Sequence, residues 1–202
     1  MVGHVERFNP VVSEMKKLIT DETIYAIDAR RYSNFDGRIT DANVVFDLMI
    51  HDIDIICNFL CKEDIKNLQS VSSSVKTNLI DFAECIIKFE NGVIANITAS
   101  RITNDKVREL IIHTSGSYIK ADLLNKTLHV TKNSALFTTL STNSSYKLES
   151  ISQRIFIPLI EPLVSELLHF GNCISTDSVP FTDGNSALHA IKIAEDITHN
   201  SV

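Results

Sequence analysis

The sequence contains no tryptophan, few aromatic residues and no excess of basic residues. Aromatic residues make up 7% of the 202 residues, and 25 acidic residues outnumber 19 basic ones, which gives a formal charge of −6. Proteins that bind nucleic acids need clustered positive charge, and those that bind single strands also use aromatic platforms for the bases. Nucleic acid and anionic membrane surfaces are therefore not expected as partners.

Long apolar runs are also absent. No run reaches the roughly 18–20 residues that a membrane-spanning helix needs. The first ten residues, MVGHVERFNP, lack the apolar segment of a secretory signal. Four cysteines are scattered through apolar stretches, at Cys57, Cys61, Cys85 and Cys173. Such cysteines are typical of reduced thiols in a cytosolic protein, so we expect a cytoplasmic protein without a membrane span.

Glycine is scarce, and the six glycines are widely spaced. The closest pair, Gly171 and Gly184, is 184 − 171 = 13 residues apart. Neither a GxGxxG loop nor a Walker loop can be built from them. Cys57 and Cys61 are four residues apart, but no second pair completes a zinc site. The sequence therefore predicts neither a dinucleotide site nor a metal site in this chain.

Residues 44–60, VVFDLMIHDIDIICNFL, predict a helix that is apolar on every side and therefore buried. On an α-helical wheel four polar residues of this stretch fall on one line: Asp47, His51, Asp54 and Asn58. Either each of them bonds to neighbouring backbone and only orients the helix, or the line marks a functional cleft. In the second case Asp47, four residues before His51, orients the imidazole for proton transfer near neutral pH.

The remaining patterns predict an α+β two-layer sandwich, with an open-faced, mostly antiparallel sheet of five or six strands and helices on one face. Asn91-Gly92 is a strong hairpin signal, and residues 132–152 form a polar excursion or weak strand. Asn9 is expected to cap a helix that starts at Pro10. We expect strands at 2–8, 23–32, 68–75, 81–90, 93–101, 107–113, 117–122 and 127–131, and helices at 10–19, 44–60, 162–175 and from 182 or 183 to about 200.

Four segments together resemble the C-terminal domain of the Gfo/Idh/MocA oxidoreductases: VGHVERFNP, VVFDLMIHDIDI, FAECIIKFENGVIANITASR and EPLVSELLHF…VPFTDGNSALHAIKIAEDI. Within that family the likeness is greatest to nucleotide-sugar dehydrogenases of the UDP-N-acetylglucosamine 3-dehydrogenase type. The resemblance implies that residues 1–10 are a remnant of the last strand and crossover of a nucleotide-binding domain that is otherwise absent. Residues 11–202 would then be the substrate-binding domain. The missing Rossmann domain would hold NAD or NADP, and neither is expected to bind this chain alone.

The resemblance also implies roles for individual residues. His51 matches the family's catalytic histidine, which takes a proton from a sugar hydroxyl while hydride leaves the same carbon for the nicotinamide. Asp47 matches an aspartate that contacts substrate and orients this base. Asp54 and Asn58 would be structural polar residues. The chain departs from many relatives in having the bulky Leu48-Met49-Ile50 ahead of the histidine, which puts the size of the binding site in doubt.

Three further positions are assigned to substrate binding by the same resemblance. Arg7 and Asn9 match the nicotinamide and substrate side of the crossover, and Arg101 resembles an arginine near the substrate in the nucleotide-sugar branch. For Arg7 and Arg101 the alternative is a surface or interface ion pair.

Three functions follow from these patterns. The first is the substrate-binding and catalytic domain of an NAD(P)-dependent sugar or nucleotide-sugar dehydrogenase, inactive alone and dependent on a missing or separate nucleotide-binding chain. The second is a non-catalytic module that forms homo-oligomers through the mixed sheet face that carries Asn96, Thr98 and Ser100. The third, a metal-dependent phosphohydrolase built on His51-Asp52, would need further ligands on neighbouring helices, whereas His113 and His129 fall in predicted strands.

Overall fold

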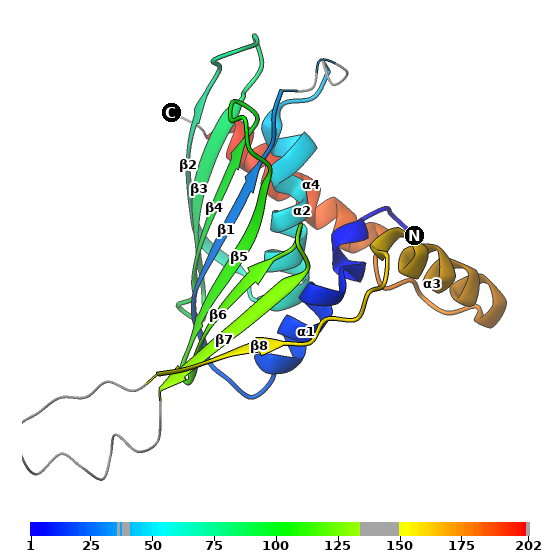
Figure 1. The fold of residues 1–202 in the computed structure, drawn as a ribbon. Coiled ribbons are helices and arrows are strands. Elements are labelled where there is room, and N and C mark those ends of the chain that lie inside the picture. The colour runs from blue at the N-terminus through cyan, green and yellow to red at the C-terminus, as the bar shows by residue number, and fades with distance from the viewer. Residues whose placement is uncertain (36, 38–40, 134–149, 201–202) are drawn as a thin grey trace, which may run out of the picture.

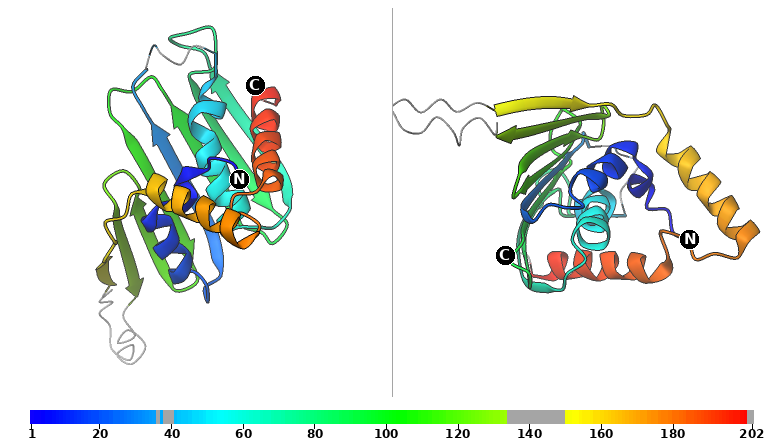
Figure 2. Two further views of the ribbon diagram at one scale, coloured as in Figure 1. Left: turned by 90° about the vertical axis from the view of Figure 1, so that its right-hand side faces the viewer. Right: turned by 90° about the horizontal axis from the view of Figure 1, so that it is seen from below.

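The computed structural model describes residues 1–35, 37, 41–133 and 150–200, and it has two layers. One mixed sheet of eight strands forms the first layer, and the helices cover one of its faces (Figures 1 and 2). The strands are β1 (Ile24–Tyr32), β2 (Ile65–Ser73), β3 (Phe82–Phe89), β4 (Ile94–Ser100), β5 (Val107–Thr114), β6 (Ser117–Asp122), β7 (Thr127–Asn133) and β8 (Ser150–Ile155). The helices are η1 (Val5–Phe8), α1 (Pro10–Leu18), η2 (Val45–Met49), α2 (Ile50–Ile53), η3 (Asp54–Leu60), α3 (Pro162–Thr176) and α4 (Gly184–His199).

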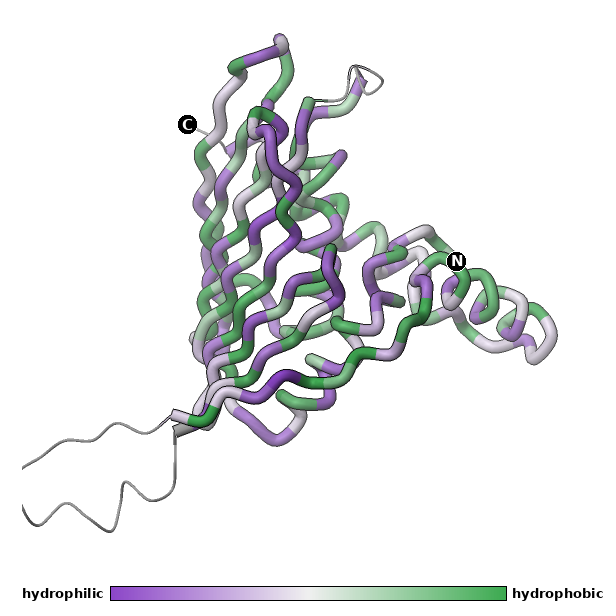
Figure 3. Tube along the Cα trace, viewed as in Figure 1, coloured by the Kyte–Doolittle hydropathy of each residue, from purple (hydrophilic) through white to green (hydrophobic). Residues whose placement is uncertain are grey.

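The sheet order is β2-β3-β4-β1-β5-β6-β7-β8. β1 pairs in parallel with β4 and antiparallel with β5, and every other neighbouring pair is antiparallel. Side chains alternate between the two faces, as Figure 3 shows by the alternation of hydrophobic and hydrophilic residues along the strands. The predicted α+β class is confirmed.

The predicted number of strands, five or six, is wrong. One strand missed by the patterns is β8, which begins inside the polar stretch 132–152. β8 pairs with β7 through its backbone, and five of its residues, 150–154, are exposed. An edge strand that buries no apolar row leaves no alternating pattern in the sequence, so it could not be recognised. Residues 134–149 of the predicted excursion lie outside the described residues.

The hairpin predicted at Asn91-Gly92 is confirmed. It joins β3 to β4, and Gly92 has a φ of 90°, a left-handed conformation that glycine adopts without strain. The Asn91 side-chain oxygen accepts a hydrogen bond of 3.1 Å from the backbone nitrogen of Val93. Turn chemistry alone therefore sets the register of these two strands.

The strand predicted at 2–8 is wrong, because this segment folds as the short helix η1. Its backbone bonds are local: the nitrogen of Arg7 donates to the carbonyl of His4, and that of Asn9 to the carbonyl of Glu6. Glu6 and Arg7 are both buried, and each forms an ion pair with a different element. Asn9 then caps α1, its side-chain oxygen accepting from the nitrogen of Val11 at 3.1 Å, as predicted.

A buried helix is confirmed where 44–60 predicted one, but it is not an ordinary α-helix. In this central helix, residues 45–60, one α-helical turn (α2) lies between two π-helical segments (η2 and η3). The nitrogen of Cys61, for example, donates to the carbonyl of Ile56 at 2.7 Å, five residues back. A π-helix holds more residues per turn, so a wheel drawn for an α-helix misplaces side chains along it.

The two C-terminal helices are placed differently. α4 starts after its cap Asp183 and buries five apolar side chains against the core: Ala187, Ala190, Ile193, Ala194 and Ile197. α3 lies at the side of the molecule, away from the sheet and near the N-terminus (Figure 2). Across the described residues, every helix is too short or too polar to traverse a lipid bilayer.

Candidate active site

Two buried arginine–aspartate pairs surround the α-helical turn that carries His51. In the first, Arg31 on β1 makes two hydrogen bonds to Asp52, of 2.7 Å and 2.9 Å. A third nitrogen of Arg31 bonds to Glu6 of η1 at 2.9 Å. Burial alone would lower the pKa of Arg31 and raise that of Glu6, but their opposite charges shift both pKa values the other way. Glu6 and Arg31 are therefore both charged, and Arg31 ties the sheet to η1 and to the central helix.

The second pair joins Arg7 of η1 to Asp54, the first residue of η3 in the central helix. Arg7 bonds to Asp54 through two nitrogens, at 2.6 Å and 2.5 Å, and a third nitrogen donates to the carbonyl of Phe181 at 3.0 Å. The imidazole of His4 lies 3.6 Å from the same carboxylate. Arg7 and Asp54 are both almost fully buried. These contacts are those of a buried ion pair within the chain, whereas the alternative expected for Arg7 was a surface or interface ion pair.

Asn58 extends this network to α4. Its amide donates to Asp54 at 2.9 Å and to the carbonyl of Ser186 at 2.8 Å. The side-chain oxygen of Asn58 lies 2.7 Å from Nδ1 of His189. Asp54 and Asn58 thus hold three segments together: η1, the central helix and α4.

His51 lies between the two pairs and belongs to neither. Its side chain is half-buried, and its Nδ1 atom is buried with no hydrogen-bond partner in the part of the chain that the structure describes. Burial lowers the pKa of His51, and the charge of Arg31 lowers it further, while the carboxylates of Asp52 and Glu6 oppose the shift. His51 is therefore neutral at pH 7 and able to accept a proton.

Asp47 lies on η2, half-exposed, one element before His51 in the chain. Since Nδ1 of His51 has no partner, Asp47 does not bond to that nitrogen. The π-helical winding of η2 explains this, because the i, i+4 alignment assumed for an α-helix no longer holds.

Asn9 and Arg101 are both engaged in structural contacts. Besides capping α1, Asn9 donates to Glu6 at 3.0 Å. Arg101 bonds to Asp81 at 2.7 Å and to the carbonyl of Ala42 at 2.8 Å, and it is almost fully buried. Burial would raise the pKa of Asp81, but hydrogen bonds from Arg101 and from the backbone of residues 76 and 77 hold it well below its usual range. Arg101 thus anchors the loop before β3 through a buried ion pair within the chain, and not through the surface or interface pair given as its alternative.

Sequence reasoning missed Glu6, Arg31 and Asp52. Arg31 left one signal: it shares the inward-facing row of its strand with Ile27 and Ala29, and all three are buried. A charged residue in an apolar row of a strand needs a buried partner of opposite charge. Asp52, which is next to His51 in the sequence, is the carboxylate that could have been predicted as the partner of Arg31.

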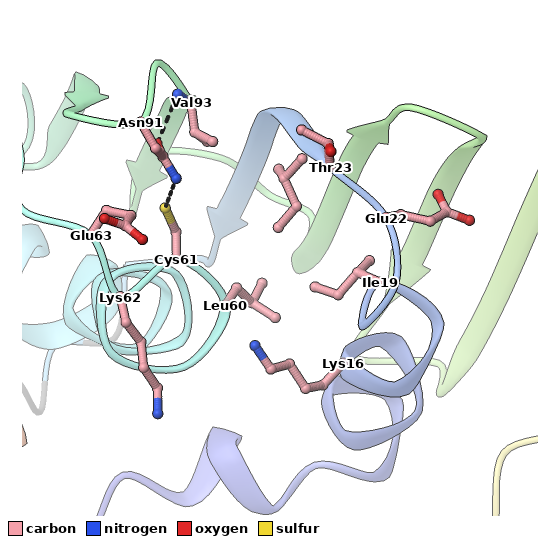
Figure 4. A pocket seen from close by; sticks show the side chains of 11 residues that line it. Lys16, Ile19, Glu22, Thr23, Leu60, Cys61, Lys62, Glu63, Asn91 and Val93 are labelled. Atoms are coloured by element: carbon pink, nitrogen blue, oxygen red, sulfur yellow. Dashed lines mark hydrogen bonds between the residues drawn. The ribbon is translucent and has the colours of Figure 1, made fainter.

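A cavity of about 300 Å³ lies elsewhere, between the end of α1, the end of the central helix and the β3–β4 hairpin (Figure 4). Lys16, Cys61 and Asn91 are among its lining residues, and Asn91 contacts the Cys61 sulfur at 4.0 Å. None of the predicted site residues lines it. Among the described residues, no three His, Cys, Asp or Glu side chains are grouped so as to hold a metal ion.

Comparison with known proteins identifies the class of the chain. Residues 16–119 match the family model described as the GFO/IDH/MocA C-terminal domain. The chain therefore belongs to the Gfo/Idh/MocA family, and the resemblance seen in the sequence is confirmed.

Particular relatives are dehydrogenases. The chain is 30% identical over 129 residues to UDP-N-acetylglucosamine 3-dehydrogenase of Acidithiobacillus ferrooxidans, a match that covers 64% of this chain and 41% of that protein. A solved structure of that enzyme superposes with a TM-score of 0.86 and 25% identity, over 98% of this chain and 61% of the relative. Levoglucosan dehydrogenase in complex with NADH and L-sorbose shares the fold, with a TM-score of 0.80 at 13% identity over 100% of this chain and 63% of that one. The chain thus spans about three fifths of its solved relatives.

Proposed function

We propose that this chain is the substrate-binding and catalytic domain of an NAD(P)-dependent oxidoreductase that oxidises a hydroxyl of a sugar or nucleotide sugar. His51 is the base, and Asp47 contacts the sugar. A nucleotide-binding domain outside this chain holds the hydride acceptor. The observation that carries this proposal is the neutral, half-buried His51, whose Nδ1 has no partner among the described residues and which lies on the helix that carries the buried carboxylates of Asp52 and Asp54. The names of the relatives, a UDP-N-acetylglucosamine 3-dehydrogenase and a sugar dehydrogenase bound to NADH, support it.

The chemistry assigned to this chain is proton acceptance. The imidazole of His51 takes the proton of the reacting hydroxyl while the hydride leaves the same carbon, so the alcohol becomes a ketone. Burial, and after it the charge of Arg31, keeps the imidazole neutral before the reaction, and Asp52 and Glu6 stabilise the imidazolium that forms. Arg7 and Arg31 fix the backbone around the base by their ion pairs.

The residues of this chain do not fit a dinucleotide. Pyrophosphate recognition of the usual kind needs glycines within a few residues of one another, whereas the closest pair here, Gly171 and Gly184, is 13 residues apart. We therefore assign no cofactor-binding residue to this chain, and NAD and NADP remain equal candidates for the partner domain.

The test is to reconstitute the chain with a separate nucleotide-binding domain and to follow reduction of NAD with UDP-N-acetylglucosamine. We expect His51→Ala to lower kcat by about 10²–10⁴-fold, the usual contribution of a general base. His113→Ala, which alters an exposed histidine on β5, is the matched control and should leave kcat unchanged. Equal activity of wild type and His51→Ala would overturn the assignment. The chain without the domain should show no saturable binding of NAD.

We also assign the protein to the cytoplasm. All four cysteines are buried and none forms a disulfide. Buried free thiols are the state expected in a reducing compartment.

A second candidate is a non-catalytic module that self-associates through the open face of the sheet. Thr98 and Ser100, predicted for this face, are already buried. Five apolar side chains are nevertheless exposed on it: Tyr25, Val71, Ile86, Ile94 and Tyr118. Sedimentation distinguishes the two candidates, because a dimer broken by Ile86→Asp, without any effect of His51→Ala on activity, would favour the module.

A further inference from the structure

The two buried arginines near His51 bind their carboxylates in the same way. A guanidinium presents its Nε and Nη2 atoms along one edge, which matches the two oxygens of a carboxylate. In Arg7 this edge holds Asp54, and in Arg31 it holds Asp52. The third nitrogen, Nη1, donates in each case to a different acceptor. Both guanidinium groups therefore have an acceptor at all three nitrogens.

Arg108 on β5 makes the Nη1 contact and lacks the other two. It lies directly opposite Arg31 in the antiparallel register of β1 and β5, so both side chains share one face of the sheet. Its Nη1 donates at 3.2 Å to Oε1 of Glu6, the oxygen that Arg31 reaches at 2.9 Å. Its Nε and Nη2 atoms have no hydrogen-bond partner among the described residues. Arg108 thus repeats the pattern of the two buried arginines, but no carboxylate of the described chain faces its Nε–Nη2 edge.

The position of Arg108 makes it accessible to a ligand and brings it close to the proposed base. Its side chain is 44% exposed, whereas those of Arg7 and Arg31 are 3% and 2% exposed. The carboxylate that fixes its Nη1, that of Glu6, is buried. Burial lowers the pKa of His51, and the charge of Glu6 opposes that shift, so this carboxylate lies near the imidazole. A single buried side chain therefore connects Arg108 to the surroundings of His51.

We propose that Arg108 binds an oxyanion of the substrate, a phosphate or a carboxylate, through its Nε–Nη2 edge. This inference rests on the proposed function, because it places the anionic part of a sugar substrate beside His51. The oxyanion is a phosphate if the substrate is a nucleotide sugar and a carboxylate if it is a sugar acid. Both groups offer two oxygens to the same edge, and such charge-assisted pairs are stronger than neutral hydrogen bonds. Since Glu6 already fixes the guanidinium through Nη1, less side-chain freedom is lost when the oxyanion binds.

The experiment measures binding to the full chain by isothermal titration calorimetry. The probes are UDP, which carries phosphates, and glucuronate, which carries a carboxylate, with uridine and glucose as their uncharged counterparts. We expect a charged probe to bind about tenfold or more tightly than its uncharged counterpart. Arg108→Gln should weaken that binding by about the same factor, and Arg108→Lys, which keeps a charge but not the two-nitrogen edge, should have an intermediate effect. The charged probe that binds more tightly identifies the source of the oxyanion.

Arg30→Gln is the matched control. Arg30 is exposed on β1, and successive side chains of a strand alternate, so it lies on the opposite face of the sheet from its neighbour Arg31. This variant should leave the affinity for the charged probe unchanged. The Tm of each variant shows that the fold is intact. In the reconstituted enzyme, Arg108→Gln should raise KM and change kcat little, since it removes binding and not proton acceptance.

Four results would overturn the proposal: no binding of either charged probe, equal binding of the uncharged counterpart, binding unaffected by Arg108→Gln, or equal weakening by Arg30→Gln. Failure of this inference is distinguishable from failure of the proposed function. If neither charged probe binds while His51→Ala abolishes activity of the reconstituted enzyme, the function stands and the oxyanion site is rejected. If a probe binds through Arg108 and His51→Ala stays fully active, the oxyanion site is kept and the base is rejected.

Discussion

The central helix and α3 differ in whether their buried carboxylates have partners of opposite charge. The central helix is apolar all round, and its two buried aspartates, Asp52 and Asp54, each meet an arginine from another segment of this chain. α3 buries one carboxylate, Glu166, one oxygen of which has no hydrogen-bond partner among the described residues, and it exposes its leucines. The buried carboxylates of the central helix therefore have charged partners within this chain, whereas the buried carboxylate of α3 lacks one among the described residues. The same type of substitution should therefore have opposite effects in the two helices.

The largest effect is expected for Asp54→Leu. It removes the carboxylate that pairs with Arg7 and leaves a buried guanidinium with only the carbonyl of Phe181. Breaking a buried pair by removing one partner lowers the free energy of unfolding by about 3–5 kcal/mol. Urea denaturation followed by circular dichroism measures it. The double variant Arg7→Met and Asp54→Leu should recover part of the loss, and a loss below about 1 kcal/mol would mean that the pair is not effectively buried.

The matched change in α3, Glu166→Leu, should stabilise. It removes a buried oxygen that has no partner, and relief of one such group raises the free energy of unfolding by about 1 kcal/mol. Glu161→Leu, at an exposed acidic residue just before α3, should stay within about 0.5 kcal/mol of wild type. A destabilising Glu166→Leu would show that this carboxylate has a partner in solution, and it would weaken the contrast between the helices.

The smallest expected effect is the change of stability with pH that Glu166 and His51 cause. Burial raises the pKa of Glu166, so the folded state disfavours its ionised form, and its contribution to stability falls as the pH rises above about 4.5. Burial and Arg31 lower the pKa of His51, so its contribution instead falls as the pH drops below about 6.5. NMR titration of the imidazole signals, with His51→Gln to assign the resonance, should give a midpoint for His51 below 6.5. A midpoint above that value would contradict the influence assigned to Arg31.

Much of the fold could be predicted because local signals and global structure agree. Asn91-Gly92 marked the β3–β4 hairpin, Asn9 and Pro10 marked the start of α1, and the unbroken apolar stretch marked the buried central helix. The errors lie where pairing depends on distant residues. β8 exposes five of its six residues, and residues 2–8 form a helix because Glu6 and Arg7 find ionic partners on β1 and the central helix.

The candidate site was predictable only in part. The block that holds His51 was found because polar residues in an apolar helix are conspicuous. Its π-helical winding could not be read from the sequence, so an α-helical wheel does not settle how Asp47 lies relative to His51, and their partnership stays a prediction. The roles of Asp47, His51, Arg7, Asn9 and Arg101 in binding and catalysis stay predictions.

The position of β1 has a consequence for how the chain reaches its final shape. β1 is the first strand of this sheet in chain order, yet it is hydrogen-bonded between β4 and β5, which end at residues 100 and 114. The hairpins β3–β4 and β5–β6 can form from residues close in the sequence, whereas β1 can be hydrogen-bonded on both edges only when β4 and β5 are present. Non-local pairing of this kind slows folding, because loop closure must precede the contacts that reward it. During synthesis, β1 therefore lacks one of its two neighbours until residue 114 has been made.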